Sequence, residues 1–172
     1  MDLKSMIREV LDFPKEGVSF KDITTVIRDG QALRYCIRTM ADYFRPKKPE
    51  IVVGVESRGF LLGAPLAYEL GVGFVLVRKP GKLPAATERI QYQLEYGTDA
   101  LEIHRDSFSP GTRVLMVDDL LATGGTIKAA AELVERLQGE IVGFSFLIEL
   151  LYLGGRKKLE GYDVLSLVQY ES

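Results

Sequence analysis

The sequence predicts an α/β fold in which a central parallel sheet is flanked by helices. Residues 51–55 and 73–77 are apolar runs of strand length, and residues 60–70 between them have the spacing of a helix. This alternation of strand, helix and strand is typical of parallel sheets. Residues 114–117 form a third apolar run, and strands that are apolar throughout suit a sheet covered on both faces.

Further helices and strands are predicted on either side of this unit. Apolar residues from Leu3 to Leu11 fit one helical face and predict an opening helix, and a second helix is predicted from Gly30 to Phe44. A third helix is predicted from Gly125 to Leu137, where apolar residues again form a stripe. Apolar runs over residues 141–148 and 164–168 predict the last strands.

The composition indicates a single domain spanning residues 1–172. The chain is 47% hydrophobic, and its formal net charge of −2 gives no general attraction to nucleic acid or to an anionic membrane. The single Cys36 excludes an internal disulfide, and no apolar run is long enough to cross a bilayer. The start of the chain is unlike a secretory signal. We therefore expect a cytoplasmic protein that binds neither nucleic acid nor membrane.

One long segment, from Arg78 to Ser109, interrupts the alternation of strands and helices. It begins with a loop rich in proline and glycine, and two strand-like runs, Tyr92 to Tyr96 and Ala100 to Arg105, flank Gly97. This pattern predicts a hairpin that reaches out of the sheet. An insertion of this length between two core strands is typical of a lid that excludes water from a site.

The most informative segment follows the strand at 114–117. Gly124 and Gly125 let the backbone approach an anion closely, and Thr123 and Thr126 offer hydroxyl donors. The free N–H groups at the start of the next helix carry a partial positive charge. A phosphate group fits such a turn without any lysine.

Two adjacent carboxylates, Asp118 and Asp119, stand between that strand and the turn. They would repel a phosphate, so their expected partners are sugar hydroxyls or a magnesium ion held between hydroxyls and phosphates. Taken singly, the aspartates could be a polar strand end and the glycines an ordinary turn. Their order and context favour a site for a phosphorylated sugar, and neither a Walker-type P-loop nor a dinucleotide fingerprint is present.

The segment resembles the phosphoribosyl-diphosphate (PRPP) binding signature of type I phosphoribosyltransferases. The resemblance extends over nearly the whole chain, including residues 13–23 and 56–60. Two segments, Arg78 to Pro84 and Leu94 to Gly97, are similar to the adenine phosphoribosyltransferases in particular. Alternatives that stay open at this point are transfer to another base, such as xanthine or orotate, and a non-catalytic PRPP-binding regulator.

The resemblance implies the type I phosphoribosyltransferase fold. A small N-terminal hood for the base would comprise residues 1–30 with C-terminal elements, and a flexible hairpin lid would comprise residues 79–109. The implied reaction is the conversion of adenine and PRPP into AMP and diphosphate, a step of purine salvage. Magnesium would be carried mainly by PRPP, since no cluster has the ligand spacing of a protein metal site. A homodimer is also implied.

The resemblance further assigns two groups of residues to PRPP. The ribose and 5′-phosphate would be bound by Asp118, Asp119, Ala122, Thr123, Gly124, Gly125 and Thr126. The departing diphosphate would be bound by Glu56, Ser57, Arg58, Gly59, Lys79 and Lys82. Both turns follow parallel strands, whose carboxyl ends bind ligands in open α/β sheets. The competing interpretation is an ordinary turn with a surface arginine and two solvated lysines.

Glu95 is the expected catalytic residue. By the resemblance it lies near base and sugar, where a carboxylate can assist the proton change on adenine and stabilise positive charge on the ribose. The alternative is an exposed hairpin glutamate. Members of the 6-oxopurine branch typically carry an aspartate where this chain has Ala122. Alanine exchanges no proton, so the acid–base work must come from elsewhere, which favours adenine over hypoxanthine or guanine. The lone His104 is given no role.

The adenine site is the least determined part of the sequence. The resemblance puts Phe20 against the adenine ring, with backbone groups around Ser19 and Lys21 reading its edge and Leu150 closing the opposite face. Phe20 and Leu150 could equally be core residues. Some family members carry valine and arginine where this chain has Ser19 and Lys21, which argues against a side-chain role there.

Overall fold

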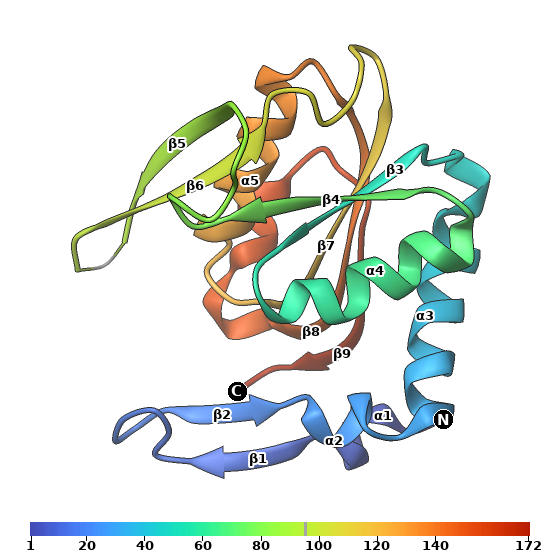
Figure 1. Ribbon diagram of the computed structural model, residues 1–172. Helices are drawn as coiled ribbons and strands as arrows, with labels where there is room; N and C mark the ends of the chain where they lie inside the picture. Colours follow the sequence, from blue (N-terminus) through green and yellow to red (C-terminus); the bar gives the residue numbers. More distant parts are fainter. Residues whose placement is uncertain (95) are drawn as a thin grey trace.

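The computed structural model describes residues 1–94 and 96–172 and confirms the predicted α/β class. A seven-stranded sheet forms its centre, in the order β5-β6-β4-β3-β7-β8-β9 (Figure 1). Neighbouring strands from β4 to β9 in this order pair in parallel. They are β4 (Gly73–Arg78), β3 (Ile51–Val55), β7 (Arg113–Leu121), β8 (Glu140–Leu150) and β9 (Val164–Tyr170). Each contains one of the predicted apolar runs.

Helices cover both faces of this sheet. The helices α3 (Gly30–Phe44) and α4 (Arg58–Leu70) lie on one face, and α5 (Gly125–Arg136) lies on the other (Figure 1). Neighbouring strand residues alternate between the two cores, so Val52 packs with α3 and α4 while Val53 packs with α5. Among the described residues, no helix has both the length and the apolar character needed to cross a membrane.

The predicted opening helix from Leu3 to Leu11 is wrong. The helix α1 comprises only Leu3–Met6, and Arg8–Leu11 form β1, which pairs antiparallel with β2 (Ser19–Asp22). Leu11 is 71% exposed, so the apolar residues of this segment do not share one buried face. The backbone of β1 instead forms its hydrogen bonds with a strand later in the chain. The spacing of apolar residues within the segment does not reveal such a contact. A short helix, α2 (Thr24–Ile27), then leads to α3.

The N-terminal elements pack against the last strand. Lys4 Nζ donates to the backbone oxygen of Gln169 at 2.9 Å, and Lys21 Nζ lies 4.4 Å from the centroid of the Tyr170 ring. The chain ends beside β2 (Figure 1). N-terminal and C-terminal segments are thus side by side, as a hood made from both requires, while its role in binding a base stays a prediction.

The segment from Arg78 to Ser109 contains a hairpin, as predicted, formed by β5 (Thr87–Gln93) and β6 (Thr98–His104). Its first strand begins earlier than the predicted run from Tyr92 to Tyr96, because pairing with β6 extends back to Thr87 with His104. The hairpin joins the parallel strands through two residue pairs, Val77 with Ile103 and Arg78 with Glu102. Its far end projects from the body of the molecule (Figure 1). The hairpin is therefore an antiparallel extension of the sheet edge, and its movement as a lid stays a prediction.

Two boundaries near the strand ends differ from the prediction. The strand β7 continues through both aspartates to Leu121, because β8 continues beside it as far as the pair Leu121 with Glu149. The helix α4 begins at Arg58, two residues before the predicted start at Phe60. Three short 3₁₀ helices complete the chain: η1 (Arg45–Lys47), η2 (Leu151–Leu153) and η3 (Gly155–Leu159).

Gly143 sets the distance between α3 and the sheet. A β-carbon added there would lie 2.3 Å from the ring of Phe44 and 3.0 Å from the backbone oxygen of Asp163. We predict that Gly143→Ala lowers the free energy of unfolding by about 1–3 kcal/mol relative to Gly73→Ala. A β-carbon at Gly73 would lie no closer than 3.7 Å to the Ile51 side chain.

Both substitutions replace a glycine in a strand. The stability gained by restricting the backbone of the unfolded chain is therefore common to both variants. Urea unfolding followed by circular dichroism measures the difference between the two variants. Equal stability would contradict the steric role of Gly143.

Candidate functional site

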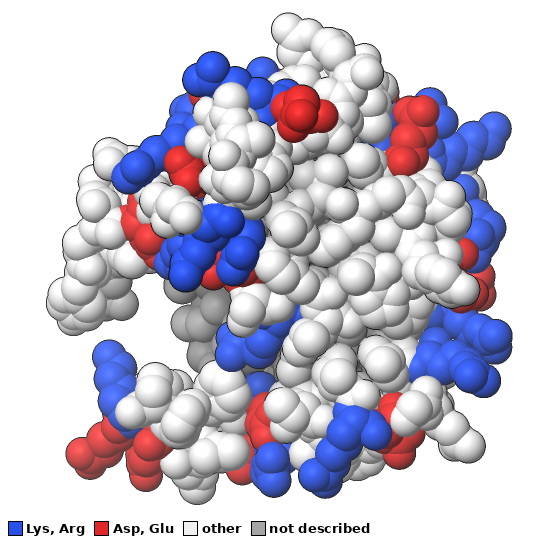
Figure 2. All heavy atoms as spheres, viewed as in Figure 1, with Lys and Arg blue, Asp and Glu red and all other residues white. Residues whose placement is uncertain are grey.

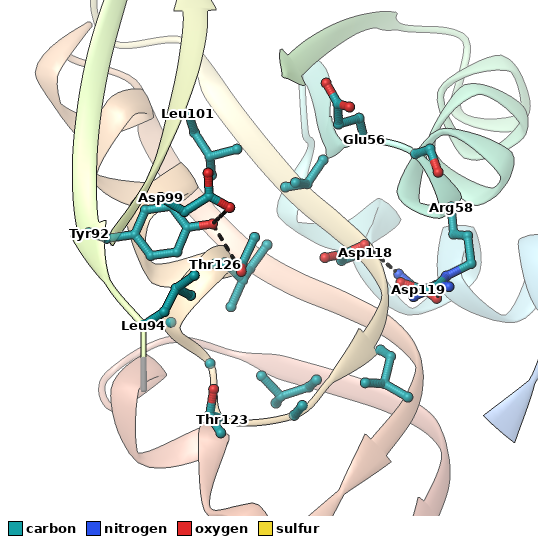
Figure 3. A pocket seen from close by; sticks show the side chains of 18 of the residues that line it. Glu56, Arg58, Tyr92, Leu94, Asp99, Leu101, Asp118, Asp119, Thr123 and Thr126 are labelled. Atoms are coloured by element: carbon teal, nitrogen blue, oxygen red, sulfur yellow. Dashed lines mark hydrogen bonds and ion pairs between the residues drawn. The ribbon is translucent and has the colours of Figure 1, made fainter. Parts of the chain in front are cut away.

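A cleft of about 500 Å³ lies at the carboxyl ends of β3 and β7 (Figure 3). Most of the residues predicted to bind PRPP line it: Glu56, Ser57, Arg58, Lys79, Asp118, Asp119, Ala122, Thr123, Gly124, Gly125 and Thr126. Two strand-to-helix turns, remote in sequence, meet here because β3 and β7 are parallel neighbours. The hairpin contributes Tyr92, Leu94, Asp99 and Leu101 from its own side.

The two aspartates at the end of β7 have different surroundings. Asp119 is 7% exposed and receives a 2.6 Å hydrogen bond from Arg58 Nε, which also makes an ion pair with it (Figure 3). Burial raises the pKa of Asp118 well above its usual range, and the charge of the neighbouring Asp119 adds to this shift. Asp118 can therefore hold a proton at higher pH than an exposed carboxyl would. Both side chains line the cleft as acceptors for hydroxyl groups.

The β7–α5 turn, residues 122–126, has the geometry of an anion site. Gly124 has a φ of +85°, which a side chain would disfavour, and it stands directly before the first turn of α5. The N–H groups of that first turn have no acceptor within the helix and point toward the cleft end. The Thr126 hydroxyl lies 3.4 Å from the Tyr92 hydroxyl of the hairpin. Backbone and hydroxyl groups thus lie together in this turn, and their role in binding a phosphate stays a prediction.

The turn between β3 and α4 forms the other side of the cleft. Its Glu56 carboxylate accepts hydrogen bonds from the backbone N–H of Lys79 at 2.7 Å and from Arg78 Nε at 3.2 Å. The Glu56–Ser57 peptide bond is cis. Gly59 is buried behind this wall, where a β-carbon would lie 2.9 Å from Asp118 Oδ1. Glu56 and Gly59 therefore shape the turn, while Ser57 and Arg58 are its exposed polar groups.

Lys79 and the hairpin form a charged contact that the sequence did not indicate. Lys79 Nζ donates to Asp99, and this bond lowers the pKa of Asp99 and raises that of Lys79. The Tyr92 hydroxyl lies 3.5 Å from the same carboxylate. Tyr92 and Asp99 are register partners in the hairpin. The alternation of the two strands could have marked them as neighbours, but not as neighbours of Lys79.

Two of the described residues predicted to bind PRPP, Gly59 and Lys82, do not line the cleft. Lys82 is exposed in the loop before β5 and does not line the cleft. Glu95, the expected catalytic residue, lies outside the described residues. Leu94, in the hairpin, lines the cleft.

The predicted adenine residues lie beside the cleft rather than in its lining. The Phe20 ring is 5.4 Å from Arg58 Cζ, which places it next to the turn between β3 and α4. The Lys21 side chain is directed elsewhere: its Nζ lies 3.0 Å from Glu9 Oε1 and 3.2 Å from Ser19 Oγ. The Ser19 hydroxyl also donates to Glu9. Leu150 is 8% exposed and belongs to the core.

Charges on the molecule are local rather than global. Figure 2 shows basic and acidic side chains interspersed around the edge of the face that it draws, with few charges at its centre. In the described part of the chain no group of three or more His, Cys, Asp or Glu side chains could hold a metal ion. The lone His104 accepts a 3.2 Å hydrogen bond from the Ala85 N–H through Nε2, in keeping with the absence of an assigned role.

Comparisons with known proteins agree with this geometry. The model of the phosphoribosyl transferase domain matches residues 24–167. The adenine phosphoribosyltransferase of Clostridium perfringens is 60% identical over 171 residues, covering 99% of each chain. A crystal structure of the enzyme of that name from Thermoanaerobacter pseudethanolicus is 57% identical, with a TM-score of 0.95 and 98% of each chain covered. The Saccharomyces cerevisiae structure, complexed with adenine and an imino-altritol bisphosphate, is 40% identical, with a TM-score of 0.92 and 96% of each chain covered.

These relatives match the whole chain, including the hood and hairpin segments, and not only the PRPP signature. The chain therefore belongs to the adenine phosphoribosyltransferase family, the transferases of purine salvage that convert adenine and PRPP into AMP and diphosphate.

Proposed function

We propose that PRPP binds across the two turns of the cleft. The 5′-phosphate occupies the β7–α5 turn, Asp118 and Asp119 receive the ribose hydroxyls, and Ser57 and Arg58 hold the diphosphate. The observation that carries this proposal is the meeting of two helix N-termini, those of α4 and α5, in one cleft. A ligand with phosphate groups at both ends of a sugar fits two anion sites separated by carboxylates.

Magnesium in this proposal is held mainly by the phosphates and hydroxyls of PRPP. Of the carboxylates that line the cleft, Asp119, Glu56 and Asp99 are already paired with Arg58, Arg78 and Lys79, so the protein supplies few free ligands of its own. When bound, the ion would neutralise charge on the departing diphosphate. The part left to the protein is to orient the ribose between the carboxylates and the two turns.

Adenine is proposed to bind between the hood and the cleft, with its ring against Phe20. The proximity of Phe20 to Arg58 supports this position, since it puts an aromatic face near the proposed leaving group. Because the Ser19 and Lys21 side chains are engaged with Glu9, main-chain groups of β2 are the available donors and acceptors for the edge of the base. The yeast relative is complexed with adenine, which supports the choice of base.

The hairpin is proposed to act as the lid, residues 79–109, over the bound substrates. It carries Tyr92 and Asp99 to the cleft, and Lys79 and Lys82 precede it in the same segment. Closure would exclude water from a cation-like ribose and bring Glu95 toward the base. There Glu95 would assist the proton change at N9 of adenine and stabilise the positive charge on the sugar.

Synthesis of AMP from adenine and PRPP tests the substrate assignment. With magnesium present, we expect AMP and diphosphate from adenine, and little product from hypoxanthine, guanine, xanthine or orotate. Chelation of magnesium with EDTA should abolish turnover, because PRPP would lose its counter-ion. Liquid chromatography of the nucleotide products gives both results. Product from another base in preference to adenine would overturn the choice of base, and no product from any base would favour a PRPP-binding regulator.

Replacing Glu95 tests the proposed catalytic group. We predict that Glu95→Leu lowers kcat by a factor on the order of a hundred to a thousand, the usual effect of losing one preorganised group at the transition state. Gln93→Leu is the matched control, because Gln93 is exposed in the same hairpin and is not part of the proposed site. Initial rates at saturating adenine and PRPP give kcat for both variants. Normal turnover of Glu95→Leu would remove Glu95 from the mechanism.

A cytoplasmic homodimer completes the proposal. An apolar surface over α4 and β4 supports the dimer, because Leu61 is 45% and Tyr68 88% exposed there and Figure 2 shows few charges over these elements. The free, buried thiol of Cys36 is in keeping with a reducing compartment.

Light scattering after size-exclusion chromatography tests the dimer. We predict a mass twice that of the 19.2 kDa chain. Leu61→Glu would introduce a charge into the apolar surface and shift the mass toward that of the monomer. Leu11→Glu, at a leucine that is 71% exposed in the N-terminal hairpin, should leave the mass unchanged. A monomeric wild-type protein at micromolar concentration would refute the dimer.

A further inference from the structure

An ion pair between a buried carboxylate, Glu149, and the partly exposed Arg156 lies beside the β7–α5 turn and takes no part in the site described so far. Glu149, near the end of β8, is 2% exposed. Its carboxylate accepts two hydrogen bonds from Arg156, from Nε at 2.9 Å and from Nη2 at 2.5 Å. Ser166 Oγ donates to the same carboxylate at 2.6 Å. Such a two-pronged contact fixes the orientation of both charged groups.

The residue before Arg156, Gly155, packs directly against the β7–α5 turn. A β-carbon at Gly155 would lie 2.4 Å from the backbone oxygen of Ala122 and 3.1 Å from the backbone nitrogen of Gly124. In the other direction, a β-carbon at Gly124 would lie 2.8 Å from the backbone oxygen of Gly155. The two backbones are thus in direct contact, with no room for a side chain between them. The position of Gly155 limits where the turn can be.

Glu149 is also connected to the same turn by the strand pairing of the sheet. It is the register partner of Leu121, the last residue of β7 before the turn, and of Gln169 in β9. Arg156 Nη1 also donates to the backbone oxygen of Val164 at 3.1 Å. The ion pair therefore ties η3, β8 and β9 together at the point where the chain leaves β7.

Both members of the pair are charged at neutral pH, as a lasting contact between them requires. The hydrogen bond from Arg156 lowers the pKa of Glu149, although burial by itself would raise it. The carboxylate therefore stays charged at neutral pH. Removing Arg156 leaves the buried carboxylate of Glu149 without its cation, and removing Glu149 frees the partly exposed Arg156 side chain from its fixed position.

We propose that Glu149 and Arg156 are positioning residues for PRPP binding. They hold Gly155 against the β7–α5 turn and so fix the donors that bind the 5′-phosphate. The inference rests on the proposed role of that turn. Neither side chain lines the cleft, so they act through the backbone and not by touching the substrate. Their loss should impair binding of PRPP more than binding of adenine.

Steady-state kinetics of AMP formation, with PRPP and adenine varied separately, test this proposal. For Glu149→Gln, Arg156→Gln and Gly155→Ala we expect the KM for PRPP to rise about ten- to hundredfold, as small displacements of a positioning group do. The KM for adenine should stay within about twofold of wild type. The double variant Glu149→Gln/Arg156→Gln should be no worse than the more impaired single variant, because both changes break one contact.

Lys157→Gln is the matched control, since it removes a positive charge one residue from Arg156 and Lys157 makes no ion pair with the described residues. It should leave both KM values unchanged. Thermal unfolding by circular dichroism confirms that each variant is folded. If the glutamine variants do not fold, Arg156→Lys decides, because it keeps the charge and loses only the two-pronged geometry. It should raise the KM for PRPP alone.

Thr123→Ala separates this proposal from the one on which it rests. An unchanged KM for PRPP in Thr123→Ala would count against the role of the turn itself. A raised KM in Thr123→Ala, together with an unchanged KM in the folded ion-pair variants, would overturn the positioning role alone. Equal rises of both KM values, or strictly additive effects in the double variant, would also overturn it.

Discussion

The parallel pairing of β3 with β7 is the constraint on which the rest of the site depends. Their register sets Gly54 beside Val117, so both strands end at the same edge of the sheet and the chain leaves each one into a helix. The N-termini of α4 and α5 therefore meet in one cleft. A helix N-terminus alone offers a few N–H donors and a partial charge. Two such ends with carboxylates between them have the arrangement that the proposed binding of a sugar with phosphates at both ends requires.

Close packing of backbone on backbone makes this arrangement possible. Gly59 lets the start of α4 approach β7, where a β-carbon would lie 2.9 Å from Asp118 Oδ1. Gly63 lets the next turn pack on Phe74, since a β-carbon there would lie 2.4 Å from the ring. On the other side of the cleft, Gly124 and Gly155 bring η3 against the β7–α5 turn. These positions require glycine because a side chain would collide with a neighbouring part of the chain. The reason for each glycine is therefore a contact in space and not a pattern in the sequence.

The sequence predicted those parts that depend on contiguous residues. The buried strands appeared as apolar runs because both faces of the sheet are covered, and the residues from Asp118 to Thr126 lie together along the chain. The N-terminal hairpin was mistaken for a helix because its strand pairing lies between distant residues, Arg8 with Asp22 and Leu11 with Ser19. For the same reason the contact of Asp99 with Lys79 was missed, since only the fold of the hairpin brings them together.

Charge pairing explains how a chain with a net charge of −2 can form a site for a highly charged anion. The cations that face the cleft are held by carboxylates: Arg58 by Asp119, and Lys79 by Asp99. Pairing keeps each positive charge in place at the wall, and it prevents a broad basic field that would attract other polyanions. The side chains of Arg58 and Lys79 are partly exposed. An incoming phosphate can therefore compete with the carboxylates for these two cations without the full cost of breaking a buried pair. In the proposed mode of binding, the specificity of the site would then depend on the positions of the backbone donors at the two turns.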